Sequence, residues 1–184
     1  VPATFTNCTF KSNSATKGVC GALYVTSTGV LTMDNCTFKG NSASTNGGAV
    51  YIADGGSVTA TNCDFESNSA SSAGAIYTAG AAVVKLDRCT FRLNKATSTE
   101  KNQGGGAIWA TGTSKVYLNR CFLTNNQDEY NAHHIYSGTS SYIGVNNCVI
   151  RGPYGVKKTQ GSLLQIKGSN VIVNSTLISQ TGSW

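Results

Sequence analysis

The segment 127–134, which reads QDEYNAHH, gathers more groups capable of chemistry than any other stretch of the 184-residue chain. It contains two of the eight acidic residues and both histidines. Histidine and carboxylate side chains can ligate a metal together. Adjacent residues of a strand point to opposite sides, however, so both histidines do not easily face one ion. We therefore predict a polar corner rather than a metal or catalytic site, with alternative metal ligands at Asp128, Glu129, His133 and His134, and we expect no cofactor.

The remaining acids are mostly isolated in the sequence: Asp34, Asp54, Asp64, Glu66, Asp87 and Glu100. Glycoside hydrolysis typically requires two carboxyl groups about 5–10 Å apart. The repeat described below places Glu66 between Lys39 and Arg92, which predicts a surface charge column rather than an active site. We therefore expect no catalytic residues, and a carbohydrate-binding or carbohydrate-active protein is the alternative to a non-enzymatic one.

A nine-residue motif recurs along the chain and indicates how these side chains are positioned. It reads NCTFKSNSA at 7–15, NCTFKGNSA at 35–43 and NCDFESNSA at 62–70, and diverging copies follow at 88–96, 120–128, 147–155 and 174–182. Six cysteines stand in register at steps of 28, 27, 26, 32 and 27 residues: Cys8, Cys36, Cys63, Cys89, Cys121 and Cys148. Repeats of this length are typical of solenoid proteins.

Apolar residues alternate with period 2 within each repeat, which predicts strands, about three to each repeat. Short strands joined by Gly and Asn corners at a constant period form the coils of a parallel β-helix, in which equivalent residues stack about 4.7–4.9 Å apart. We predict one all-β domain over 1–184, a right-handed parallel β-helix of six to seven coils, either complete or a segment of a longer solenoid. The inward columns should include the six cysteines above, the phenylalanines Phe10, Phe38, Phe65 and Phe91, and the hydrogen-bonded asparagines Asn13, Asn41, Asn68, Asn94 and Asn126.

The cysteines in register should be buried free thiols, because parallel Cα–Cβ vectors on stacked strands do not suit a disulfide. Cys20 lies outside this column and has no evident partner in the sequence. A second motif, Gly-Ala-aliphatic-aromatic, places an aromatic column between the cysteines: Tyr24, Tyr51, Tyr77, Trp109 and Tyr136. If the preceding aliphatic residues, which run from Leu23 to Leu163, point inward, these rings form an exposed strip for a sugar or a protein partner.

Phe-x-x-Asn at 10–13, 38–41, 65–68 and 91–94, together with Gly-Gly-Ala-aliphatic at 47–50 and 105–108, resembles the repeats of polymorphic outer-membrane proteins. The resemblance covers residues 5–126 and fades afterwards. It implies the β-helix passenger of an autotransporter-type surface protein and adhesion to host cells. We accordingly expect a secreted or cell-surface location.

Composition and charge exclude other classes. Charged residues make up 12% of the chain and no apolar run reaches the length of a membrane span, so we expect neither disorder nor membrane insertion by this segment. The net charge of +6 is not concentrated in the sequence, so nucleic acid is not an expected partner. Partners should be a cell-surface protein, a glycan, or a second copy stacked head to tail. Three sequons predict N-glycosylation in a eukaryotic source, at Asn7, Asn35 and Asn174.

Overall fold

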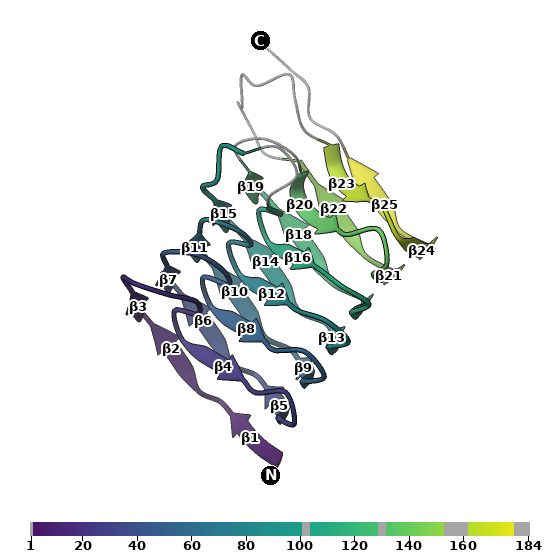
Figure 1. Ribbon diagram of the computed structural model, residues 1–184. Helices are drawn as coiled ribbons and strands as arrows, with labels where there is room; N and C mark the ends of the chain where they lie inside the picture. Colours follow the sequence, from purple (N-terminus) through teal and green to yellow (C-terminus); the bar gives the residue numbers. More distant parts are fainter. Residues whose placement is uncertain (1, 101–103, 129–131, 153–161, 179–184) are drawn as a thin grey trace.

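The molecule is a stack of coils that rises from strand β1 at the N-terminal end to β24 and β25 at the C-terminal end (Figure 1). The computed structural model describes residues 2–100, 104–128, 132–152 and 162–178, with the backbone alone at Ala132 and His133. These residues form 25 strands and, within these ranges, no helix. The strands assemble into four sheets, and every pairing is parallel and joins one coil to the next.

Two seven-stranded sheets carry the cysteine side of the repeat. Sheet A contains β1 (Pro2–Thr6), β5 (Val30–Asp34), β9 (Ser57–Thr61), β13 (Val83–Asp87), β17 (Lys115–Asn119), β21 (Tyr142–Asn146) and β24 (Ser169–Val173). Sheet B contains β2 (Thr9–Lys11), β6 (Thr37–Lys39), β10 (Asp64–Glu66), β14 (Thr90–Arg92), β18 (Phe122–Thr124), β22 (Val149–Arg151) and β25 (Thr176–Ile178).

Two further sheets close each coil. Sheet C contains the two-residue strands β3 (Ser14–Ala15), β7 (Ser42–Ala43), β11 (Ser69–Ala70), β15 (Lys95–Ala96) and β19 (Gln127–Asp128). Sheet D contains β4 (Leu23–Val25), β8 (Val50–Ile52), β12 (Ile76–Thr78), β16 (Ile108–Ala110), β20 (Ala132–Ser137) and β23 (Ser162–Ile166).

The parallel β-helix predicted from the repeat is confirmed, but the first five coils each contain four strands rather than three. The additional strand is the two-residue strand of sheet C, Ser-Ala in the first three coils, which is too short for a period-2 alternation to be visible. The register is also displaced at the C-terminal end of sheet D. Ile135 pairs with Leu164 rather than Leu163, because an irregularity lies between Ala132 and Ile135.

The phenylalanine column lies inside the coils. The rings of Phe10, Phe38, Phe65 and Phe91 stack with centroids 4.7, 4.9 and 4.7 Å apart and interplanar angles of 6° or less. The last three are fully buried. Because parallel strands place equivalent residues one above the other, each ring covers the ring of the coil before it. Burying one phenylalanine side chain in each coil contributes about 1.5–3 kcal/mol to folding, so this column is a principal source of stability.

The asparagine column is buried next to the rings and is joined by hydrogen bonds from coil to coil. The Nδ2 of Asn68 donates to Oδ1 of Asn94 at 3.0 Å and to the carbonyl oxygen of Phe38 at 2.9 Å. Its Oδ1 accepts from both the backbone N–H and Nδ2 of Asn41, each at 2.9 Å. The same pattern recurs along the column, so every polar atom of this buried amide is satisfied.

The corner before each cysteine position turns in the left-handed region. Asn7, Asn35, Asn62, Asn147 and Asn174 have φ between 46° and 56°. Arg88 and Arg120 occupy the same corner with φ of 52° and 53°. Asparagine tolerates this conformation better than most residues, which accounts for its recurrence before cysteine.

Candidate binding surfaces

The cysteine column belongs to the core. All seven cysteines are free thiols, and those at positions 36, 63, 89, 121 and 148 are buried. Their Sγ atoms lie 3.2–3.5 Å from backbone carbonyl oxygens, as Cys36 does from Phe5 and Asp34. Burial raises the pKa of the Cys36 thiol, which keeps it protonated and poorly nucleophilic. Cys20 is half-buried, and burial raises its pKa as well.

The structure describes only part of the histidine-containing segment 127–134. His134 in β20 is fully buried, and its Nδ1 lies 3.0 Å from Nδ2 of Asn126. The Oδ1 of Asn126 already accepts from Asn94, so the amide donates and His134 Nδ1 accepts. His134 therefore forms the end of the asparagine column. Asp128 is buried in β19, whereas Glu129 and the side chain of His133 lie outside the described residues.

Within the described ranges, no group of three or more His, Cys, Asp or Glu side chains is arranged to hold a metal ion. The carboxylates instead join neighbouring coils. Glu66 is nearly buried and lies 2.8 Å from Nζ of Lys39 and 2.9 Å from an Nη of Arg92, the charge column that the repeat predicts. The hydrogen bond from Lys39 and the charge of Arg92 lower the pKa of Glu66.

Asp87 forms a second set of ion pairs at the C-terminal end of β13 in sheet A. It lies 2.6 Å from Arg88 and 2.8 Å from Arg120, and the amide of Asn119 donates to it at 2.7 Å. Desolvation opposes ionisation of Asp87, but the hydrogen bonds from Arg120 and Asn119 outweigh it and lower the pKa.

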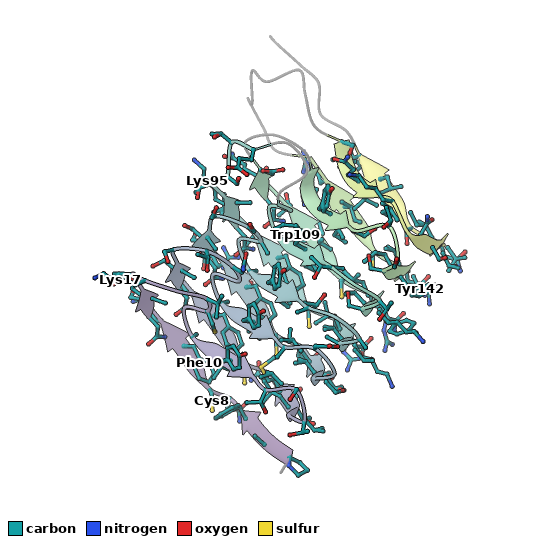
Figure 2. The ribbon with its side chains drawn as sticks, viewed as in Figure 1. Cys8, Phe10, Lys17, Lys95, Trp109 and Tyr142 are labelled. Atoms are coloured by element: carbon teal, nitrogen blue, oxygen red, sulfur yellow. The ribbon has the colours of Figure 1, made fainter. Side chains whose placement is uncertain are left out.

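The aromatic column lies on the outside of sheet D, because the preceding residues Val50, Ile76 and Ile108 are fully buried. Exposure decreases along the column, from 54% at Tyr24 to 3% at Tyr136. Lys167 covers the last ring, with its Nζ 5.1 Å from the centroid. Figure 2 shows Trp109 on this face, well separated from Tyr142 of sheet A.

The rings of this aromatic column pack against one another. Tyr24, Tyr51 and Tyr77 stack at centroid distances of 5.1 Å with interplanar angles of 7° and 15°. Trp109 meets Tyr77 and Tyr136 edge to face at 86° and 87°. A ligand approaching the stacked tyrosines therefore meets ring edges and hydroxyl groups more than flat ring faces.

A groove on the outside of sheet A is a second surface, and the sequence analysis did not identify it. It crosses β9, β13 and β17 and has a volume of about 630 Å³. We call it the lysine–tyrosine groove after the exposed side chains of Lys85, Lys115 and Tyr117 that line it. Lys85 and Tyr117 are register partners on adjacent strands, and Lys115 lies two residues before Tyr117 on the same face.

The signal for this groove lies in two outward columns, four and six residues before each cysteine position. Thr59, Lys85, Tyr117 and Gly144 follow one another in the first column, and Val83, Lys115 and Tyr142 in the second. These columns change residue type from coil to coil, so a search for repeated letters overlooks them.

Comparison with known proteins identifies the architecture. The family model described as "right handed beta helix region" matches residues 20–183. The chain belongs to the right-handed β-helix family. A search of the curated proteins and of the solved structures finds no significant match. The narrower likeness to polymorphic outer-membrane protein repeats therefore stays a prediction from the motifs.

The three sequons of this right-handed β-helix lie at exposed left-handed corners, where Asn7, Asn35 and Asn174 are accessible. The Nδ2 of Asn35 donates to Oδ1 of Asn7 at 2.7 Å, so the two amides are neighbours on successive coils. Their exposure is compatible with glycosylation, which stays a prediction. The part of the chain that the structure describes contains no helix long and apolar enough to cross a membrane.

Proposed function

We propose that this right-handed β-helix is a non-catalytic scaffold of a secreted or cell-surface protein, and that it acts by presenting its outer faces to a surface partner. The resemblance of its Phe-x-x-Asn and Gly-Gly-Ala repeats to polymorphic outer-membrane proteins supports adhesion to host cells as the role. The partner would be a cell-surface protein or glycan.

The observation that carries this proposal is the use of the acidic side chains as links between coils. Glu66 and Asp87 are held in ion pairs that lower their pKa values. Asp34 accepts a hydrogen bond from Asn62 at 3.1 Å, and Asp54 accepts one from the backbone N–H of Ala81 at 2.6 Å. A general acid for glycoside cleavage needs a raised pKa, so Glu66 and Asp87 suit a structural role better than a catalytic one.

An attachment assay with a parallel cleavage assay tests this proposal. Beads coated with the chain should attach to cultured epithelial cells, and the soluble chain should compete with that attachment. Polysaccharides incubated with the chain should gain no new reducing ends. Cleavage of a glycan would favour the carbohydrate-active alternative, and attachment no greater than that of albumin-coated beads would contradict the adhesive role.

Head-to-tail stacking is a second candidate, favoured by the apolar surface at the two outermost coils. Phe5 and Phe10 are only half-buried in the first coil, and the inward positions Ile172 and Leu177 of the last strands are 37% and 45% exposed. A second copy stacked on either end would cover these residues. Sedimentation velocity at increasing concentration tests the second copy, because stacking should produce progressively larger species and a constant monomer would exclude it.

A further inference from the structure

We propose that the lysine–tyrosine groove of sheet A binds an oligosaccharide that carries sulfate or carboxylate groups. This inference rests on the proposed scaffold function and names the face and the chemical class of its ligand. It selects the outside of sheet A over the aromatic column of sheet D.

The positive charge of the groove is available to a ligand. Lys85 and Lys115 are exposed, and neither forms an ion pair with the described residues. Asp87 also lines the groove, but its carboxylate is held by Arg88 and Arg120 at its edge. The acid therefore does not neutralise the lysines, and the groove presents two mobile ammonium groups to an anion.

One aromatic side chain, Tyr117, lines the groove, and Tyr142 of the next coil packs beside it. The Tyr117 ring is 38% exposed, and its centroid lies 5.3 Å from that of Tyr142 at an interplanar angle of 45°. Both rings lean over Gly144, where an added Cβ would lie 3.3 Å from Cδ1 of Tyr117 and 3.2 Å from Cε1 of Tyr142. The glycine therefore makes room for the rings. Because the rings are tilted rather than stacked face to face, part of the Tyr117 surface stays available for the C–H groups of a sugar ring.

The size and charge of the groove favour a short acidic glycan over a nucleic acid. A volume of about 630 Å³ lies within the range of small-ligand sites. Nucleic-acid affinity depends on neutralising several phosphates, whereas this groove offers two lysines without an ion pair among the described residues. The exposed hydroxyl of Thr59 at its other end is suited to a sugar hydroxyl.

The aromatic column is the less suitable site for the same ligand. Its tyrosines stack at 5.1 Å and cover one another's faces, and no lysine or arginine register partner stands in that column between Tyr24 and Tyr136. Sugar recognition there would depend on ring edges alone. A comparison of Tyr117 with Tyr24 therefore separates the two faces.

Calorimetric titration of the whole chain tests the proposal with four defined probes. These are a heparin hexasaccharide, which carries sulfate and carboxylate, a hyaluronan hexasaccharide, which carries carboxylate alone, neutral maltohexaose and a six-residue oligothymidine. We expect at least one acidic sugar to bind and maltohexaose not to bind. The first two probes distinguish the two sources of negative charge.

Matched variants locate the site. The double substitution Lys85→Gln and Lys115→Gln should weaken binding of the acidic sugar by about tenfold or more, because two charge-assisted contacts are lost. The double substitution Lys11→Gln and Lys17→Gln removes the same charge from exposed positions elsewhere, and it should change affinity by less than about twofold. Figure 2 shows Lys17 on the side of the molecule opposite Tyr142. Tyr117→Ala should weaken binding, and Tyr24→Ala should not.

Three results would overturn the inference: equal losses in the two lysine pairs, binding of maltohexaose as tight as that of the acidic sugars, or tighter binding of oligothymidine. Failure of both acidic sugars to bind would overturn it as well. The bead assay separates this failure from that of the scaffold function. Undiminished cell attachment by the variant with Lys85→Gln and Lys115→Gln would reject the groove as the binding site and leave the adhesive scaffold function standing. Loss of attachment in that variant, with attachment kept by the variant with Lys11→Gln and Lys17→Gln, would support both the groove and the adhesive function.

Discussion

The column of Asn41, Asn68 and Asn94 and the column of Thr59, Lys85 and Tyr117 rise through overlapping coils, one inside the solenoid and one outside it. The inner column repeats one residue type because each amide must accept from the coil before it and donate to the coil after it. The outer column has no such requirement, and its residues differ at every step. The contrast indicates that stacking imposes the inner repeat, whereas the outer columns can change residue type from coil to coil without disturbing it.

The strongest way to break this contrast is to remove one inner amide. Asn68→Ala removes one of the donors to the buried carbonyl of Phe38 and leaves two buried donors of Asn41 without their partner. Each orphaned group costs about 1–3 kcal/mol, partly offset by relaxation, so we expect a loss of about 4 kcal/mol of unfolding free energy. Urea denaturation followed by tryptophan fluorescence measures it.

Asn13→Ala is the matched control at the exposed beginning of the same column. Asn13 donates to Oδ1 of Asn41 through its backbone N–H and its Nδ2, but it lies in contact with solvent. Water replaces the lost partner, and we expect a cost below about 1 kcal/mol. Equal losses at the two positions would show that the hydrogen-bonded column does not depend on burial.

The sequence predicted most of the inside of the molecule. The phenylalanine, asparagine and cysteine columns follow from period-2 alternation and a constant step, because both features are imposed by stacking. Sheet C was not foreseen, since a two-residue strand such as Ser42–Ala43 shows no alternation. The repeat aligned Ile135 with Leu163, but the structure pairs Ile135 with Leu164. An irregularity in strand pairing leaves no trace in the residue types of either strand, so the sequence did not predict it.

The outside was much less predictable. The Glu66 charge column followed from the register, since opposite charges one coil apart must approach one another. The groove could not be predicted, because the sequence does not show where the surface is hollowed. Its residues Lys85, Lys115 and Tyr117 also belong to columns without a shared residue type. The orientation of the aromatic column was decided only by the burial of the residues beside it, such as Ile76 and Ile108.

The charge column offers a test on the boundary between inside and outside. Glu66 is nearly buried between Lys39 and Arg92, and its pKa in the folded protein is lowered. A lowered carboxyl pKa stabilises the fold at pH values above the pKa of the unfolded chain, and this contribution is lost as the pH falls through the folded-state value. We expect Glu66→Gln to cost about 1 kcal/mol at pH 7 and almost nothing in acid below the folded-state pKa.

Urea denaturation of both proteins between pH 7 and pH 2 measures this difference. A difference between wild type and Glu66→Gln that stays constant as the pH falls would show that packing of the side chain, rather than its charge, stabilises the coils.

The smallest expected effect concerns a corner where the outside departs from the repeat without any evident site. Leu93 follows β14 with φ of 58° and is 50% exposed, whereas Asn125 occupies the equivalent corner one coil later with φ of 52°. A left-handed conformation costs a residue such as leucine about 1 kcal/mol more than asparagine, whose short polar side chain can hydrogen-bond locally. Leu93→Asn should therefore raise the unfolding free energy by about 1 kcal/mol or slightly less, and the reverse change Asn125→Leu should lower it by a similar amount. If Leu93→Asn destabilised the protein instead, the contacts of the exposed leucine would stabilise the fold by more than its backbone strain costs. Packing, as in the interior columns, would then determine the residue at this outer position.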